Sequence, residues 1–469
     1  MGIELDDVLW LDATSQAELI RSGEVDAADL LEAAIARCDE VNPSLNAVIH
    51  RNDDLARDRL AGVDPDAPFA GVPMLTKDLL CCEAGLPFHE GSRFLKEVGY
   101  TPDYDQVLAV RFREAGLVSF GRTNTPEFGM RPRCEPLAYG PTNNPWNLAH
   151  SPGGSSGGSA ASVAAGVVSI AHANDVGGSI RNPASNCNLF GLKPARGRSN
   201  LGPDFGDAMG GLAEELVVTR SVRDSARALD ALSLDSPAEW YQTPGVGGGF
   251  ASFEEAARTE PSSMRIGVLA EPPPDVHPGV AETVRSMGRL LESLGHRVDE
   301  TAPAALVDTD VSEMTLPHYT AGTAHFVDHY WPRVLGRPIP EDQIEPATAF
   351  LADLGRSVTG GALLEARELA QHWTRRLVSW WLDDGYDLLL LPVLADPPIV
   401  TGGGDDARIV ALAAPFNLSG LPAASVPGGF VDGLPVGVQF VAAPWREDVI
   451  FQLAAQVERA RPWFRRPSI

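Results

Sequence analysis

The stretch Ser151–Gly191 constrains the fold of this chain most, because it sets two glycine-framed serines on either side of a helix-strand unit. Ser155 lies in GGSSGG and Ser179 in GGSIR, 24 residues apart. Between them, an alanine-rich run at 159–166 predicts a helix, and the apolar run at 167–171 predicts a strand. This order can fold back and bring the two loops together. Backbone amides in glycine turns form anion-binding nests, so the pattern favours acyl transfer by a serine beside an oxyanion hole.

Three simpler interpretations of the glycine-serine motif are weaker. A flexible Gly/Ser linker would not lead directly into a helix-forming alanine run. A phosphate-binding P-loop needs a lysine at a fixed place, and the sequence has none there. Gly153–Gly157 formally matches the G-x-S-x-G nucleophile elbow, but that elbow requires a preceding strand, and Pro141–Pro152 has the composition of turns. Since the chain has ten histidines, histidine supply does not decide which base activates the serine.

Lys77 is a candidate general base. It lies in Gly71–Leu80, an otherwise apolar segment that predicts a buried strand. Burial disfavours the ammonium form, so it would lower the pKa of the amine toward neutrality and let it accept a proton. The alternative is a surface lysine beside Asp78, which is the more common fate of such a pair.

Six blocks in a fixed order give a more specific indication: GVPMLTKD, TNTPEF, AYGPTNNPW, SPGGSSGGS, DVGGSIRNPAS and FGLKP. Together with FNLSGLPAASVP and GLPVGVQFV near the C-terminus, they resemble the amidase signature family. The resemblance covers most of the chain. It implies a Ser–cis-Ser–Lys triad, with Ser179 as nucleophile, Ser155 as bridging serine with a cis peptide bond, and Lys77 as general base.

The same resemblance implies roles for the residues around the triad. It assigns the developing oxyanion to the backbone amides of Val176, Gly177, Gly178 and Ser179. It gives Asp175 and Arg181 a supporting role beside that loop. It places Gly129 and Met130 at the substrate wall.

The sequence departs from the common family wording at two positions. Asn174 and Val176 stand where threonines are frequent, and Val176 keeps the backbone amide that the oxyanion needs. The wording AHAND-GGSIR-P resembles the branch that includes 6-aminohexanoate cyclic-dimer hydrolases. Some amidases of this type also cleave carbamates, including urethanes.

The alternation of helical and apolar strand patterns predicts an α/β fold with a central mixed, largely parallel twisted sheet covered by helices on both faces. We expect one amidase signature domain over 1–469, with a signature core at about 71–200 and a variable helical substrate-pocket region at about 302–381. Near the N-terminus, a capping box at Ser15–Glu18 predicts a helix start, and Asn42-Pro43 predicts a helix stop.

Composition excludes several classes of function. A formal net charge of −26 disfavours binding to nucleic acid or an anionic membrane, and no apolar run reaches the length needed to span a bilayer. Five cysteines without C-x-x-C spacing indicate neither a disulfide framework nor a zinc site. The N-terminal residues have no signal-peptide pattern, so we expect a cytoplasmic protein. His325 and His329 have metal-ligand spacing but lack an acidic third ligand, so neither a metal nor a cofactor is expected.

The favoured hypothesis is an amide hydrolase that acts alone, as a monomer or homodimer, on a small-molecule amide or carbamate. A component of a tRNA-dependent amidotransferase, which would release ammonia for a partner, has the same signature. A catalytically silent binding protein is the third possibility, and the intact triad positions argue against it.

Overall fold

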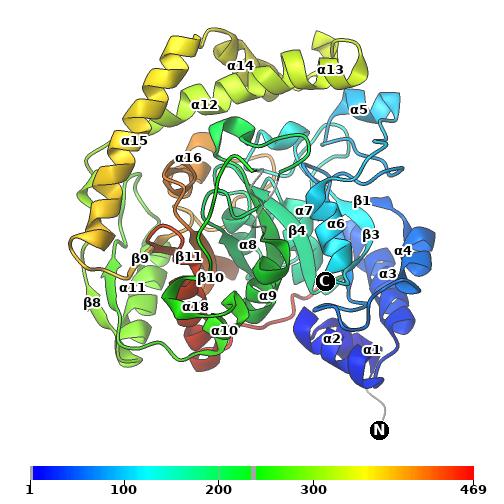
Figure 1. Ribbon diagram of the computed structural model, residues 1–469, viewed down its shortest axis with the longest axis horizontal. Coiled ribbons are helices and arrows are strands. Elements are labelled where there is room, and N and C mark those ends of the chain that lie inside the picture. Colours follow the sequence, from blue (N-terminus) through cyan, green and yellow to red (C-terminus); the bar gives the residue numbers. More distant parts are fainter. Residues whose placement is uncertain (1–3, 200, 234–238) are drawn as a thin grey trace.

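A computed structural model describes residues 4–199, 201–233 and 239–469, and its centre is one 11-stranded sheet (Figure 1). Across the sheet the strands follow the order β1-β3-β2-β4-β6-β5-β10-β11-β9-β7-β8. Their bounds are β1 (Val48–Arg51), β2 (Pro73–Lys77), β3 (Val118–Thr123), β4 (Ile170–Asp175), β5 (Phe190–Lys193), β6 (Glu214–Thr219), β7 (Arg265–Val268), β8 (Arg297–Asp299), β9 (Leu388–Pro392), β10 (Ala423–Val431) and β11 (Leu434–Ala442). The predicted mixed sheet is therefore confirmed.

The prediction that this sheet is largely parallel is wrong. β2 runs parallel to β3 and β4, and β7 runs parallel to β8 and β9. The pairings from β4 through β6, β5, β10 and β11 to β9 are antiparallel, as is β1 with β3. Buried apolar strands look alike in sequence whichever way they run, so the pattern did not reveal direction.

The β10–β11 hairpin has a specific sequence cause. Its two-residue turn is Asp432-Gly433, and both residues have positive φ, 51° and 81°. This is the backbone that a tight hairpin turn matching the strand twist requires, and Asp-Gly is a preferred pair for it. The hairpin adds two long strands to the middle of the sheet.

Helices flank the sheet. They are α1 (Leu5–Leu9), α2 (Ala13–Ser22), α3 (Ala27–Leu45), α4 (Asp53–Leu60), α5 (Arg93–Val98), α6 (Val107–Glu114), α7 (Gly157–Ala164), α8 (Arg181–Asn186), α9 (Val222–Leu232), α10 (Phe253–Arg258), α11 (Pro278–Ser293), α12 (Ser312–His325), α13 (Trp331–Leu335), α14 (Pro346–Arg356), α15 (Gly360–Leu382), α16 (Asp406–Val410), α17 (Ala414–Leu418) and α18 (Glu447–Ala460). No described helix is long and apolar enough to cross a membrane.

Two predicted helix ends near the N-terminus are wrong. The helix predicted to begin at Ser15–Glu18 is α2, and it is capped instead by Asp12, whose carboxylate accepts the Ser15 amide at 2.9 Å. Helix α3 continues past Pro43 and ends at Leu45, and the next residue, Asn46, caps it with a left-handed backbone. A proline this close to the C-terminus removes only one of the last helical hydrogen bonds, so the final turn survives.

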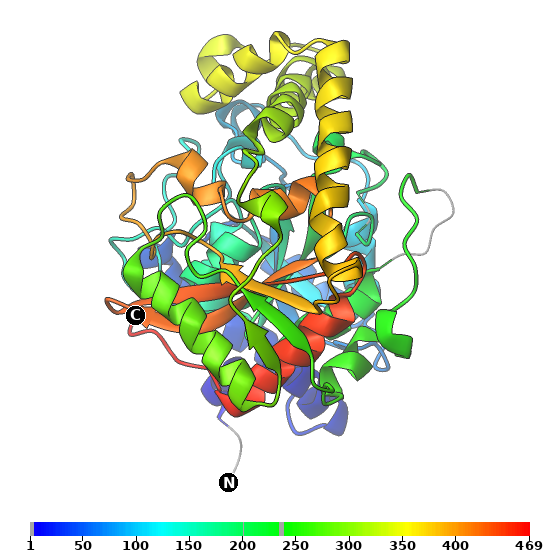
Figure 2. The same ribbon diagram turned by 90° about the vertical axis from the view of Figure 1, so that its left-hand side faces the viewer.

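The residues between β8 and β9 form a helical layer, α12–α15, that rises above the rest of the molecule (Figure 2). The helical content expected for about 302–381 is confirmed. Contacts fasten this layer to the loops at the sheet's edge: the Tyr319 hydroxyl donates to the Met130 carbonyl at 2.8 Å, and the Trp331 indole donates to Glu90 at 3.0 Å. α12–α15 therefore covers the region after β3 where substrate contacts were predicted.

Candidate active site

Lys77 is the last residue of β2, and its side chain is fully buried. Its Nζ lies 2.6 Å from Ser155 Oγ. Burial lowers the pKa of this amine to about 7. The surface alternative is wrong: the Asp78 carboxylate instead accepts the backbone amide of His89 at 3.2 Å. A buried amine of this kind can take a proton from a serine near neutral pH.

The two glycine loops meet as the sequence predicts. Ser155 lies in the loop before α7, and the expected cis peptide bond between Gly154 and Ser155 is present. The amide of Ser156 donates to the Ser179 carbonyl at 3.4 Å, which joins the loops directly. Ser155 is buried, whereas Ser179 is only partly buried. Of the two serines, Ser179 is therefore the one with a path to solvent.

Asp175 fixes the loop that carries Ser179. Its carboxylate accepts the amides of Gly178 at 2.7 Å and Ile180 at 3.2 Å. The same carboxylate pairs with Arg181 in a fully buried salt bridge of 2.9 Å. Burial acts to raise the pKa of Asp175, but the charge and hydrogen bonds of Arg181, together with Lys193 and Asn417, outweigh it and hold that pKa well below its ordinary value. The carboxylate stays ionised and shapes the turn.

Arg181 connects this loop to the C-terminal part of the chain. Its guanidinium donates to Gln439 at 2.7 Å, to Asn417 at 2.6 Å and to the Ala413 carbonyl at 2.9 Å. Asn417 also donates to Asp175 at 2.9 Å. The supporting role expected for Asp175 and Arg181 corresponds to this buried network, which reaches from β4 to β11.

Of the four backbone amides expected to bind the oxyanion, three are available in the structure. Since the Gly178 amide is bonded to Asp175, it is not available to a substrate oxygen. Within the described part of the chain, no hydrogen bond occupies the amides of Val176, Gly177 and Ser179. These three remain candidates.

Gly129 is the last residue of the short helix η1 (Glu127–Gly129), and Met130 follows it directly. A methyl group built on Gly129 would stand 3.5 Å from Ser155 Oγ and 2.5 Å from Leu79 Cδ2. Met130 is buried, and its sulfur accepts a hydrogen bond from Thr323 of α12. Gly129 therefore borders Ser155 itself, and Met130 links that border to the helical layer.

We expect Gly129→Ala to lower the free energy of unfolding by about 1–3 kcal/mol and to reduce kcat/KM, because φ at this residue is 70° and the new methyl would displace Leu79. Urea unfolding and steady-state kinetics would measure both. Gly99→Ala is the matched control, since φ there is 63° and nothing lies within 4 Å of the added methyl. Equal kcat/KM in the two variants would mean that Gly129 does not border the substrate.

Four polar residues around Lys77 were not predicted as part of the site from the sequence. Ser156 and Asn174 bond its Nζ, at 3.0 Å and 2.5 Å. His172 Nδ1 accepts the Lys77 backbone amide at 3.2 Å, so a neutral ring carries its proton on Nε2 and donates it to Glu215. Burial keeps the pKa of His172 well below, and that of Glu215 well above, their ordinary values. The sequence signal that could have revealed His172 and Asn174 is the presence of polar residues inside the otherwise apolar strand IAHAND.

The histidines of the helical layer form no metal centre in the structure. His325 and His329 stack with their ring centroids 5.9 Å apart, and His318 bonds the Met314 carbonyl at 2.8 Å. Over residues 4–199, 201–233 and 239–469, no cluster of three or more His, Cys, Asp or Glu side chains is placed to hold a metal ion.

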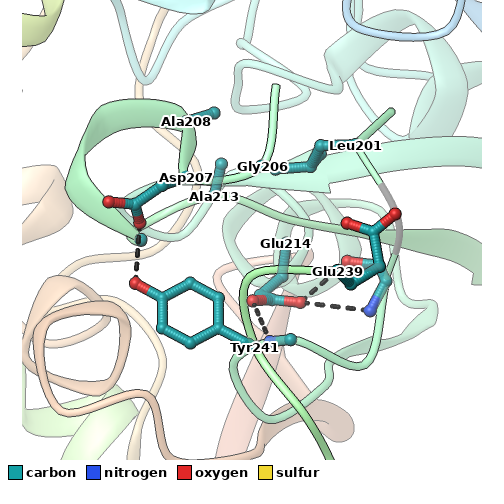
Figure 3. Close-up of a pocket in the computed structure, with 11 residues that line it drawn as sticks. Leu201, Gly206, Asp207, Ala208, Ala213, Glu214, Glu239 and Tyr241 are labelled. Atoms are coloured by element: carbon teal, nitrogen blue, oxygen red, sulfur yellow. Dashed lines mark hydrogen bonds between the residues drawn. The ribbon is translucent and has the colours of Figure 1, made fainter. Parts of the chain in front are cut away.

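A small pocket of about 20 Å³ is lined by residues between Gly197 and Glu214 together with Glu239 and Tyr241 (Figure 3). Its acidic groups are already engaged: Glu214 accepts the Gly197 amide at 2.9 Å, and the Tyr241 hydroxyl donates to Asp207 at 2.7 Å. Ala213 in its wall belongs to an apolar cluster that packs against Val176. The pocket has room for about one water molecule and is too small for an amide substrate.

The chain matches a known protein family over most of its length. Residues 29–451 match the family model described as Amidase. The chain belongs to the amidase signature family. The 6-aminohexanoate-cyclic-dimer hydrolase of Pseudomonas sp. (strain NK87) is 40% identical, and the alignment covers 98% of this chain and 97% of that protein.

Solved structures of the family have the same fold. A 6-aminohexanoate cyclic dimer hydrolase complexed with substrate superposes with a TM-score of 0.94 at 38% identity, covering 98% of this chain and 99% of that one. A glutamyl-tRNA(Gln) amidotransferase component from Thermotoga maritima superposes with a TM-score of 0.80 at 25% identity, covering 100% and 99%. This amidase is thus a hydrolase of non-peptide C–N bonds built on a single α/β domain.

Proposed function

We propose that this amidase cleaves its substrate through an acyl-enzyme formed on Ser179, with Ser155 and Lys77 carrying the proton. The observation that carries the proposal is the buried contact of 2.6 Å between Lys77 Nζ and Ser155 Oγ, in a loop joined to that of Ser179. A lysine with a pKa of about 7 is partly neutral at physiological pH and can act as a base.

The reaction proceeds in two halves. Neutral Lys77 takes the proton of Ser155, and Ser155 takes that of Ser179 as its oxygen attacks the substrate carbonyl. The amides of Val176, Gly177 and Ser179 stabilise the negative oxygen that forms. The proton returns through Ser155 to the leaving nitrogen as the C–N bond breaks, and water then releases the acid from Ser179.

The proposed substrates are neutral aliphatic amides of the 6-aminohexanoate type, cyclic or linear. Two features support this choice: the cyclic-dimer hydrolase activity of the relatives at 40% identity, and the apolar cluster around the site, which includes Leu79, Phe128, Met130 and Val176. A carbamate presents the same carbonyl to the nucleophile, so urethanes are proposed as a second group of substrates. We propose that the chain works as a monomer or homodimer without nucleic acid or membrane.

We expect purified Ser179→Ala to lose hydrolysis by about 10⁴-fold or more, because no other group would form the acyl-enzyme. The assay is release of free amine from a panel of aryl amides, aminohexanoate oligomers and dicarbamates. Ser169→Ala, a buried serine that bonds Gln16 at the other end of β4, serves as control. Full activity in Ser179→Ala would assign the nucleophile to another residue.

The amidotransferase alternative has no support beyond membership of the same family. It predicts that the isolated chain is inactive on the panel and copurifies with a partner protein. Turnover by the isolated chain, dependent on Ser179, would exclude the need for such a partner.

A further inference from the structure

We infer that Asn174 is a positioning residue for the general base: its side-chain oxygen holds one N–H of Lys77 so that the lysine lone pair points at Ser155. This inference rests on the proposed function. Asn174 lies at the end of β4, directly before Asp175, and is buried. Its Oδ1 lies 2.5 Å from Lys77 Nζ.

A neutral amine has few positions through which it can bond to its neighbours. A neutral lysine has two N–H bonds and one lone pair, and it can act as a base only along the lone pair. Three oxygens surround Lys77 Nζ, namely Ser155 Oγ at 2.6 Å, Ser156 Oγ at 3.0 Å and Asn174 Oδ1 at 2.5 Å. If two of them must accept N–H bonds, the third receives the lone pair.

Ser156 can only accept from the lysine. Its hydroxyl proton is donated to the Asn174 carbonyl at 3.2 Å. Its oxygen also accepts the Asn174 backbone amide at 3.3 Å. A hydroxyl has one proton, so with this proton committed Ser156 Oγ faces Lys77 as an acceptor.

Asn174 can also only accept from the lysine, because its amide group is held in one orientation. Its Nδ2 donates to the Leu79 carbonyl at 3.2 Å, two residues beyond Lys77 on the same chain segment. That bond turns Oδ1 toward Nζ. With both N–H bonds assigned to Ser156 and Asn174, the lone pair is left for the hydroxyl of Ser155.

The other charged and titratable groups around Lys77 do not accept a hydrogen bond from its Nζ. No carboxylate within the described residues is hydrogen-bonded to Nζ. Four groups act on the Lys77 charge, namely Asp175 on β4, Glu215 on β6, and Glu90 and Cys134 in loops. Two more bond the Lys77 backbone, namely His172 on β4 and Arg122 on β3. Asn174 is therefore the neutral acceptor whose replacement by a carboxylate would raise the pKa of Lys77 most directly.

Two substitutions separate orientation from packing. Asn174→Leu and Asn174→Asp both lose the donor to Leu79, but only Asn174→Asp keeps an acceptor for Lys77. The readout is the rate at which an alkyl fluorophosphonate phosphonylates Ser179, measured from pH 5 to 10 by intact mass. In that reaction Ser179 Oγ bonds to phosphorus as fluoride leaves, the Ser179 proton passes to Ser155, and the Ser155 proton passes to Lys77. No knowledge of the natural substrate is needed.

We expect Asn174→Leu to be labelled about 10- to 100-fold more slowly at every pH, the effect of losing one hydrogen bond to the base. We expect Asn174→Asp to recover the wild-type rate at high pH, with the acid limb moved up by about 1–3 pH units, since a nearby carboxylate stabilises the ammonium. Asn52→Leu, which removes an amide bonded to the Ser119 carbonyl at the far end of β3, should leave the profile unchanged.

Two outcomes would overturn the inference: wild-type labelling in Asn174→Leu, or an Asn174→Asp profile that follows Asn174→Leu at all pH values. Circular dichroism confirms that each variant is folded before it is scored. The proposed function fails separately, by labelling that persists in Ser179→Ala or that maps to another residue.

Discussion

Lys77→Met is expected to slow acylation by about 10²- to 10⁴-fold, the usual contribution of a positioned base. Methionine fills the buried space of the lysine stem but cannot accept a proton from Ser155. The wild-type rate should rise with pH through about 7, because only the neutral amine is active and burial lowers its pKa to that value. In the variant this acid limb should disappear.

The same substitution should change the free energy of unfolding little, because a gain from removing the lysine charge offsets the hydrogen bonds that Ser156 and Asn174 lose. The unfolded chain holds its lysine at the ordinary pKa of 10.5, so folding at neutral pH must remove a proton from Lys77, which opposes folding. Methionine carries no such penalty. Single-turnover kinetics and urea unfolding test both parts, with the exposed Lys96→Met as control. Normal turnover near neutral pH would remove Lys77 from the mechanism.

The second large effect is expected for Arg181→Ala, which should lower the free energy of unfolding by about 3–5 kcal/mol. The variant leaves Asp175 as a buried carboxylate without its cation, and it breaks the bonds to Asn417 and Gln439. Activity should fall as well, since Asp175 shapes the loop that carries Ser179. Urea unfolding measures the stability, and amine release measures the activity.

A double variant separates the charge from the packing. Adding Asp175→Asn to Arg181→Ala removes the unpaired charge, so the double variant should be more stable than Arg181→Ala alone. If instead the two losses simply add, the pair is not coupled.

The pKa of Asp175 lies below its ordinary 3.8, so the stability it contributes is present above that pH and is lost as the pH falls through the lower folded value.

The sequence was informative where chemistry requires particular residue types in a particular order. The glycines around Ser155 and Ser179 predicted two converging loops, and the structure joins them through the Ser156 amide. The apolar surroundings of Lys77 predicted its burial and a lowered pKa. The strand at 71–80 and the helical stretch after 302 were predicted for the same reason, since burial patterns are local.

What the sequence did not reveal depends on contacts between distant segments. The Asn174 side chain meets Lys77 only because β2 and β4 are neighbours in the sheet. The family resemblance assigned the Gly178 amide to the oxyanion, and nothing local in the sequence shows that the Asp175 carboxylate turns back to accept that amide. Strand direction was misjudged because it is decided by pairing partners rather than by the strand itself.

The way the helical layer leaves and re-enters the sheet has a consequence for how such enzymes diversify. The chain departs at the end of β8 and returns at β9, and both strands pair with β7. The two attachment points are thus held by one common neighbour, whatever length of chain joins them. Under the proposed function, exchange of 302–381 should change which substrates are accepted, while the strands and loops that carry Lys77, Ser155 and Ser179 stay in place. This makes the segment the natural unit to swap in directed evolution.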